Sequence, residues 1–243
     1  MHIYAIGDIH GHLELLKAAH HRIHADIALH GHARIVHLGD LVDRGPDCQG
    51  VVDYLMQGVA AGRDWVVLKG NHDRLFTAFL TNPKWHDPSL RVEHSWLHPK
   101  IGGAATLASY GVRSPADRPI GKVHADAVAA VPADHRRFLE SRPTSLACED
   151  AIFVHAGIRP GITLANQDEQ DLVWIRREFL EDTRDHGALV VHGHTAIDKA
   201  THYGNRLNLD SSAAYGGPLS AAVIEGRRAH LLTDAGRVPL LPS

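Results

Sequence analysis

Three segments of the sequence place polar side chains directly after short apolar runs. The runs cover residues 3–6, 35–38 and 66–69, and each is followed by a glycine and then by Asp or Asn. Such runs are typical of buried strands. Because open α/β sheets bind ligands at the carboxyl ends of their strands, we expect these polar side chains to meet at one rim.

The polar side chains at these strand ends, and at two later ones, form a set suited to metal binding. Its members are Asp8, His10, Asp40, Asp43, Arg44, Asn71, His72, His155 and His194. Carboxylate, imidazole and amide oxygen are ligands for Mn, Fe, Zn or Mg. There are more candidate ligands than one ion needs, so we expect two divalent ions that share a carboxylate. Two ions about 3.5–4 Å apart are suited to in-line displacement at phosphorus.

Three residues of the set have roles beyond metal binding. Arg44 follows the carboxylates directly, and a guanidinium binds phosphate oxygens bidentately. A phosphate ester has a poor alkoxide leaving group, so a proton donor is needed. We expect His72 to supply the proton, with Asp43 fixing the tautomer of its imidazole. The set as a whole therefore indicates phosphate ester hydrolysis.

Five short blocks occur in the order GD-x-HG, GD-x-x-DRG, GNH-D, HAG and GHT, from Asp8 to Thr195. In this order they resemble the phosphoprotein phosphatase branch of the calcineurin-like metallophosphoesterases, in particular its short bacterial and phage lambda-type members. Ala196 stands where the broader family has a second histidine, which argues against the nuclease and phosphodiesterase branches. Asp73 stands where many members have Glu. The resemblance implies an α/β fold of two sheets in a sandwich flanked by helices.

The resemblance also implies a role for each matching residue. The first metal would be held by Asp8, His10 and Asp40. The second would be held by Asp40, Asn71, His155 and His194, with Asp40 as the bridge. A metal-bridging hydroxide would attack phosphorus, with His72 as general acid and Asp43 as its orienting partner. Two arginines would grip the phosphoryl group: Arg44, and Arg176 in the phrase Trp174-Ile175-Arg176.

The elements that must position this set begin with a β-α-β-α-β unit. We expect strands over residues 2–7, 35–39 and 65–69, joined by helices over 12–28 and 48–61 with apolar residues at helical spacing. Right-handed crossovers would make the strands parallel, with both helices on one face.

The rest of the chain is expected to complete a single domain over residues 1–243. Residues 81–119 are rich in Pro, Gly, His and Trp, and we interpret them as an inserted lid or specificity segment. Further predicted elements are helices over 74–80 and 133–141, an antiparallel pair over 145–147 and 151–154 that turns at Glu149-Asp150, a helix through Trp174 and Phe179, a strand over 188–191 and antiparallel strands over 207–233.

The composition indicates which classes of partner to expect and where in the cell the protein acts. A formal net charge of -3 and a pI near 6.7 do not provide the basic face that nucleic-acid binding needs, so we expect no nucleic-acid partner. Two cysteines fit a reducing cytosol. The sequence shows neither a secretory signal nor a run long enough to span a membrane, so a cytoplasmic protein without a membrane partner is expected.

These observations leave three interpretations of the function. The first is a bacterial serine/threonine protein phosphatase, a phosphomonoesterase with two divalent ions, manganese being the expected metal, and a phosphoprotein substrate. The alternative is a dinucleoside polyphosphate hydrolase acting on diadenosine tetraphosphate, and residues 81–119 must decide between a protein groove and a nucleotide pocket. The third is a metal-binding scaffold without turnover, which would have little use for His72, Asp43 and Arg44.

Overall fold

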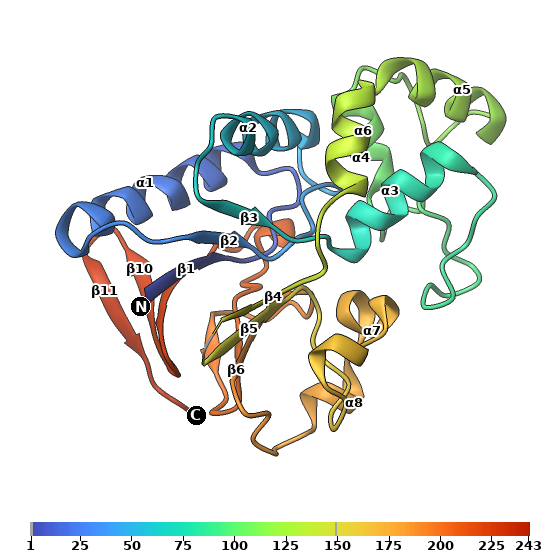
Figure 1. Cartoon of the computed structure of the whole chain (residues 1–243). Coiled ribbons are helices and arrows are strands. Elements are labelled where there is room, and N and C mark those ends of the chain that lie inside the picture. The colour runs from blue at the N-terminus through green and yellow to red at the C-terminus, as the bar shows by residue number, and fades with distance from the viewer. Residues whose placement is uncertain (1, 149) are drawn as a thin grey trace.

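The structure, a computed structural model, describes residues 2–148 and 150–243 and contains two facing β-sheets with helices on their outer sides (Figure 1). The strand order is β11-β10-β9-β1-β2-β3 in the first sheet and β4-β5-β6-β8-β7 in the second. A cluster of buried apolar side chains that includes Val36, Phe153 and Leu189 fills the space between the sheets. The predicted fold class, an α/β sandwich of two sheets flanked by helices, is confirmed.

The first sheet contains the predicted parallel core. Its strands are β1 (His2–Ile6), β2 (Ile35–His37), β3 (Trp65–Val67), β9 (Ala221–Glu225), β10 (Arg228–Thr233) and β11 (Gly236–Leu240). β1, β2 and β3 are parallel, whereas β9 pairs with β1 antiparallel. The carboxyl ends of β1, β2 and β3 therefore lie at one rim, as the β-α-β-α-β pattern predicts.

The second sheet is mixed. Its strands are β4 (Ser145–Cys148), β5 (Ala151–Val154), β6 (Leu189–His192), β7 (Thr201–His202) and β8 (Arg206–Asn208). β4 and β5 form the predicted antiparallel pair, although Glu149 of the predicted turn lies outside the described residues. The prediction of antiparallel strands over 207–233 holds for β9 and β10. β8 lies in the other sheet, where it is antiparallel to β7 and parallel to β6.

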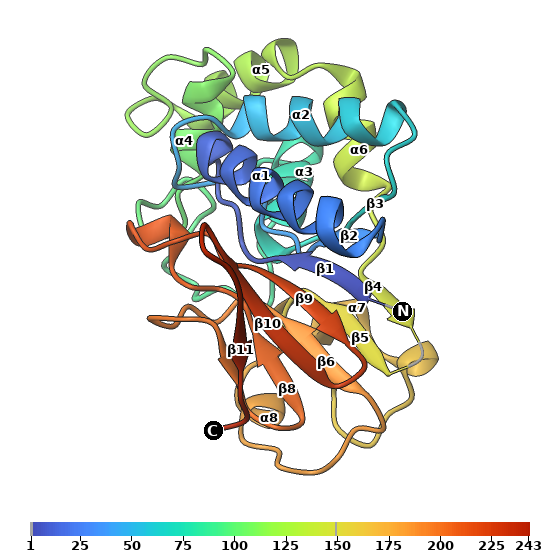
Figure 2. The same ribbon diagram turned by 90° about the vertical axis from the view of Figure 1, so that its left-hand side faces the viewer.

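Helices cover both sheets (Figures 1 and 2). They are α1 (Leu13–His30), α2 (Cys48–Ala60), α3 (Asn71–Thr81), α4 (Gly103–Ser109), α5 (Ile120–Ala130), α6 (Ala133–Glu140), α7 (Glu169–Trp174) and α8 (Arg177–Leu180), with short 3-10 turns η1 (Leu164–Asn166) and η2 (Ala213–Tyr215). Helix α3 begins three residues before its predicted start because the Asp73 carboxylate accepts from the Gly70 N–H and caps the first turn. Helix α5 has no counterpart in the prediction.

The predicted helix through Trp174 and Phe179 is two short helices instead. Arg176 lies between them with φ of -131°, outside the helical region. Its guanidinium reaches His194 at the rim of the second sheet. The break in the helix therefore places an arginine that a continuous helix would direct elsewhere.

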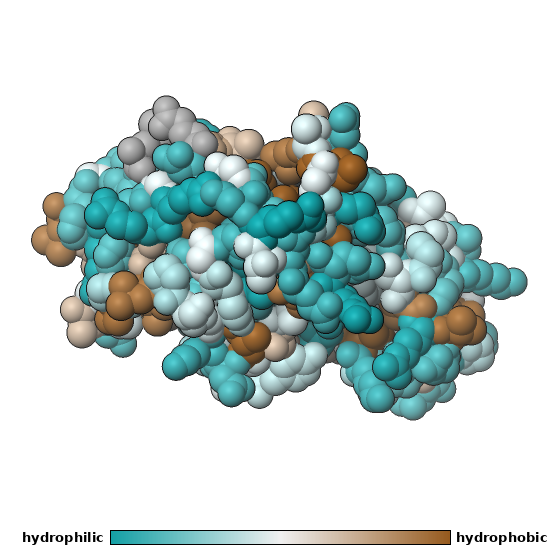
Figure 3. Space-filling view, turned by 90° about the horizontal axis from the view of Figure 1, so that it is seen from below, coloured by the Kyte–Doolittle hydropathy of each residue, from teal (hydrophilic) through white to brown (hydrophobic). Residues whose placement is uncertain are grey.

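Within the described ranges, no helix combines the length and the apolar character that a membrane span requires. Seen from below, hydrophobic side chains form small separate groups among polar ones (Figure 3). Singly exposed apolar residues of this kind are common on folded proteins.

A series of hydrogen bonds between uncharged groups links α1 to β2 within the core. His37 Nδ1 donates to the Val66 carbonyl at 3.3 Å, so its Nε2 accepts from His20 Nε2 at 2.9 Å, and His20 Nδ1 accepts from the Tyr54 hydroxyl at 2.9 Å. Burial lowers the pKa of His20 to about 2 and that of His37 to about 4. Both imidazoles are therefore neutral in the folded protein at neutral pH.

We expect the free energy of unfolding to fall as the pH drops below about 6.5, because the two histidines bind protons in the unfolded chain before they do so in the folded one. At pH 5 the loss is up to about 2 kcal/mol for each histidine. Urea denaturation at several pH values measures it. The double variant His20→Leu/His37→Leu should show a flatter pH dependence than the exposed His21→Leu control, and equal slopes for the two would contradict the account.

Candidate active site

The predicted polar residues come together where the carboxyl ends of β1, β2 and β3 meet those of β5 and β6. The six predicted metal ligands are all buried: Asp8, His10, Asp40, Asn71, His155 and His194. Two groups of nearby ligand atoms form among the described residues, one of His10, Asp40 and His72 and one of Asp40, His155 and His194. Asp40 belongs to both groups, which is the position that a bridging ligand needs.

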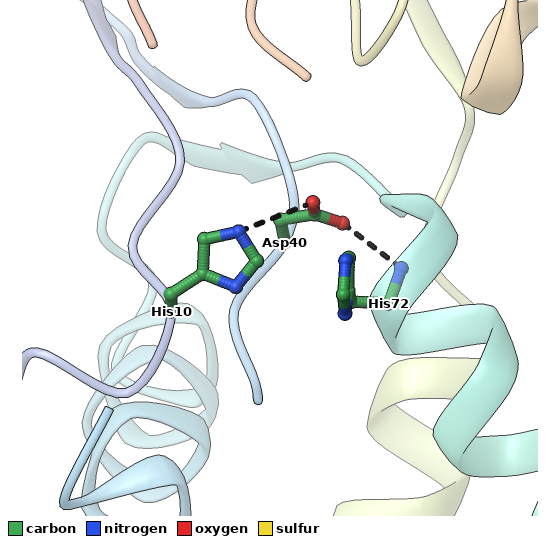
Figure 4. A group of neighbouring side chains, drawn as sticks. All are labelled: His10, Asp40 and His72. Atoms are coloured by element: carbon green, nitrogen blue, oxygen red, sulfur yellow. Dashed lines mark hydrogen bonds and ion pairs between the residues drawn. The ribbon is translucent and has the colours of Figure 1, made fainter. Parts of the chain in front are cut away.

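In the first group, hydrogen bonding fixes the orientation of the His10 ring beside Asp40 (Figure 4). His10 Nδ1 donates to the Val42 carbonyl at 2.8 Å, which leaves Nε2 with a lone pair, and this atom lies 3.4 Å from Asp40 Oδ2. The backbone N–H of His72 donates to Asp40 Oδ1 at 3.0 Å. His10 and Asp40 have φ of 45° and 49°. Such left-handed backbone costs about 1–3 kcal/mol per residue and concentrates at functional sites.

The second group directs several acceptor atoms at one point. His155 Nδ1 donates to the Leu38 carbonyl at 2.9 Å, so the Nε2 lone pair faces Asn71 Oδ1 at 2.9 Å and Asp40 Oδ1 at 3.4 Å. His194 Nδ1 donates to Asn71 Oδ1 at 2.9 Å, because His194 Nε2 accepts from Arg176 Nε. The lone pairs of His155 Nε2 and Asn71 Oδ1 repel each other, and a cation bound between them would turn the repulsion into attraction. The donor set therefore fits a divalent metal.

Asp8 contacts the turn that carries His194. Its carboxylate accepts from the His194 N–H at 2.9 Å. The preceding residue must be glycine, because a Cβ at Gly193 would overlap the Asp8 carboxylate. The third member of the first group is His72 and not the predicted ligand Asp8.

Charge is concentrated at this buried site. Burial, together with Asp210 and Asp40, raises the pKa of Asp8 well above its usual value. Burial also raises the pKa of Asp40, but His155, His72 and His10 outweigh it and hold that pKa below its usual value. Burial lowers the pKa of the three ligand histidines: His10, His155 and His194. The imidazoles are thus in the neutral form that coordinates metals.

The predicted pair of Asp43 and His72 is present and tightly held. His72 Nδ1 lies 2.6 Å from Asp43 Oδ2, which also accepts from Trp96 Nε1 at 2.9 Å. Thr106 Oγ1 donates to Asp43 Oδ1 at 2.6 Å. These contacts fix the carboxylate in a place where it receives the His72 N–H, so His72 Nε2 points into the site.

Each predicted phosphate-binding arginine contacts one of the ligand groups. Arg44 places Nη1 2.7 Å from His10 Nε2 and Nη2 3.0 Å from His72 Nε2. Arg176 Nε donates to His194 Nε2 at 3.0 Å. The next residue, Arg177, pairs instead with Glu181 at the end of α8. The two guanidinium groups therefore flank the space in front of the ligands.

Sequence reasoning did not find three residues of the site. Trp96 and Thr106 come from the segment 81–119, where no periodicity relates them to Asp43. Asp210 follows β8, and burial and the nearby Asp40 raise its pKa to about 6. Its place after a strand-like run is the available signal, but the alternating pattern of 207–233 predicts an antiparallel tail there rather than a strand end at the site.

We expect Asp40→Ala to abolish tight binding of two divalent ions, because Asp40 belongs to both groups, and Asn71→Ala to weaken one ion by about 10–100-fold or more. Calorimetric titration with Mn²⁺ measures stoichiometry and affinity, and circular dichroism checks the fold. Asn205→Ala is the control: Asn205 lies on the β7–β8 turn and donates to the backbone carbonyls of Asp182 and Arg184. Unchanged binding in Asp40→Ala would exclude the site.

Relatives with similar sequences span nearly the whole chain. The asymmetrical bis(5'-nucleosyl)-tetraphosphatase PrpE of Anoxybacillus flavithermus is 27% identical, over 89% of this chain and 87% of the relative. The protein of the same name from Geobacillus thermodenitrificans is 25% identical, over 91% and 89%. The chain is thus similar to these proteins along almost their full length.

Solved structures share the fold. A crystal structure of a candidate diadenosine tetraphosphatase superposes with a TM-score of 0.64 at 22% identity and covers 100% of this chain and 95% of that chain. The cold-active protein-tyrosine phosphatase of a psychrophilic Shewanella gives a TM-score of 0.60 at 21% identity, over 99% and 80%. At these identities the likeness shows the architecture alone.

The match to a family model agrees with the order of the motif blocks. The model of the calcineurin-like phosphoesterases matches residues 1–223, which include every strand end of the site. The chain therefore belongs to the calcineurin-like phosphoesterase family.

Proposed function

We propose that this chain hydrolyses dinucleoside tetraphosphates asymmetrically. Phosphoester hydrolysis is the activity of its family. The observation that carries the finer proposal is the similarity, over about nine-tenths of the chain, to two proteins named asymmetrical bis(5'-nucleosyl)-tetraphosphatase. Of the two enzymatic functions considered from the sequence, the comparisons favour this alternative over the serine/threonine protein phosphatase.

The residues of the site support chemistry on a phosphate chain. Two divalent ions held by the ligand groups would lower the pKa of a water molecule and neutralise phosphate charge. Arg44 and Arg176 approach from opposite groups, so one phosphoryl group between them receives a guanidinium on either side. The candidate ligands themselves are buried, so little water would compete with a phosphate for ions held there.

A cleft next to the site supports a substrate larger than one phosphoryl group. It has a volume of about 480 Å³ and begins at Arg176. Trp174 lines it, as do Arg159, which is paired with Asp171, and Arg177, which is paired with Glu181. The Trp174 ring beside Arg176 offers a flat face on which a nucleotide base could stack.

One observation favours a second candidate, a phosphomonoesterase acting on phosphorylated serine or threonine. The Asp43–His72 pair places an imidazole nitrogen in the site. The alkoxide released from a phosphorylated side chain needs a proton, whereas a nucleotide phosphate leaves as a stable anion. A dedicated proton donor is therefore more useful for an alkyl ester than for a phosphoanhydride.

We expect His72→Asn to retain metal binding but to lose about 10²–10⁴-fold in kcat on alkyl phosphates, because the leaving oxygen then departs unprotonated. The loss should be far smaller on aryl phosphates with good leaving groups and on dinucleoside polyphosphates. Steady-state kinetics on the three substrate types measure it. Trp96→Phe removes one hydrogen bond to Asp43. Its losses in kcat should be smaller than those of His72→Asn, but again largest on alkyl phosphates. Equal losses on all three types would reject the role of His72.

A substrate panel tests the proposed function itself. With Mn²⁺ present, we expect kcat/KM for diadenosine tetraphosphate to exceed that for phosphoserine and phosphothreonine peptides by at least about ten-fold, a transition-state difference of about 1.4 kcal/mol. The products, separated by anion exchange, should be AMP and ATP in equal amounts. Faster turnover of phosphopeptides would favour the second candidate, and release of ADP alone would contradict asymmetric cleavage.

A further inference from the structure

The turn after β8 presents an aromatic side chain at the edge of the candidate site. Residues 211–217 include η2, and in Figure 2 this orange-red turn projects on the left, below the green segment that carries α4. Tyr215 is 66% exposed, and its ring lies over the Arg44 guanidinium with 5.3 Å from Cζ to the ring centroid. Three aromatic residues are prominently exposed in the described ranges: Trp85, Tyr203 and Tyr215. Of these, Tyr215 is the one in contact with an arginine of the site.

The orientation of Arg44 determines which side of the tyrosine is open. The guanidinium nitrogens face His10 and His72, toward the ligand groups. Tyr215 covers the guanidinium from outside. One face of the phenol ring is therefore occupied by Arg44, and the high exposure leaves the other face to solvent.

The backbone that carries Tyr215 is held by several hydrogen bonds. Ser212, with φ of 66°, donates its N–H to the Asp210 carboxylate at 3.1 Å and its hydroxyl to the Ile197 carbonyl at 2.9 Å. The N–H groups of Tyr215 and Gly217 both donate to the Ser212 carbonyl at 2.9 Å. An exposed aromatic ring on a fixed turn loses little entropy when a ligand packs on it.

We propose that Tyr215 is a stacking platform for the nucleobase of a nucleoside polyphosphate whose phosphate chain is held at Arg44. The proposal rests on the proposed function for the identity of the phosphate chain. Every nucleobase has a flat π face, and stacking on an aromatic side chain needs no hydrogen-bond match. Tyr215 thus acts on substrate choice, while Arg44 and the ligand groups act on the phosphoryl group.

Competition against p-nitrophenyl phosphate hydrolysis tests the platform, whether or not diadenosine tetraphosphate is cleaved. The competitors are ATP and inorganic tripolyphosphate, which have equal numbers of phosphates, at a fixed concentration of free Mn²⁺. We expect the wild-type chain to bind ATP more tightly than tripolyphosphate. Tyr215→Leu should raise the inhibition constant of ATP about ten-fold. That of tripolyphosphate should rise about three-fold at most, because an exposed cation–π contact is weak.

Two further variants separate stacking from structure. Tyr215→Phe keeps the ring and should restore the preference for ATP. Tyr203→Ala removes a different exposed tyrosine that also lies over an arginine, Arg206, at 3.7 Å, and should leave both inhibition constants unchanged. Equal rises for ATP and tripolyphosphate in Tyr215→Leu would show that the ring only holds Arg44 and would overturn the proposal. So would the absence of any preference for ATP in the wild-type chain.

Discussion

The structure depends on the convergence of electron-rich side chains around Asp40. The Asp40 carboxylate faces His10 on one side and His155 on the other, and all three side chains are buried. Buried acceptors at these distances destabilise a fold unless donors or cations compensate for them. Much of the surrounding architecture can be understood as the means of holding these groups together.

The compensation comes first from the backbone. Carbonyl groups of Val42 and Leu38 each fix one imidazole, so that Nε2 of His10 and of His155 faces Asp40. The first turn of α3 donates an N–H to the same carboxylate. Strand ends of both sheets supply these groups: β1, β2 and β3 in the first sheet and β5 and β6 in the second. The site therefore needs both sheets. Arg44 and Arg176 add positive charge in front of the ligands, where a phosphate would lie.

The sequence was sufficient to predict the parallel core and the meeting of these polar side chains at one rim, because both follow from local patterns. Apolar runs ending in glycine and Asp or Asn mark strand ends, and the end of a strand determines where the next side chain points. Contacts that depend on distant segments were not predictable in this way. Trp96 and Thr106 reach Asp43 from an irregular stretch, and β8 pairs with β6 in a direction that its sequence does not encode. The break at Arg176 was missed because the apolar spacing on both sides of it is helical.

Anomalous X-ray scattering from a crystal of the Mn²⁺-loaded protein is the most direct test of the central claim. The account predicts two peaks about 3.5–4 Å apart, with the Asp40 carboxylate between them and Asn71, His155 and His194 around one of the two. Absence of a peak within bonding distance of Asp40, with ions bound elsewhere on the chain, would contradict it.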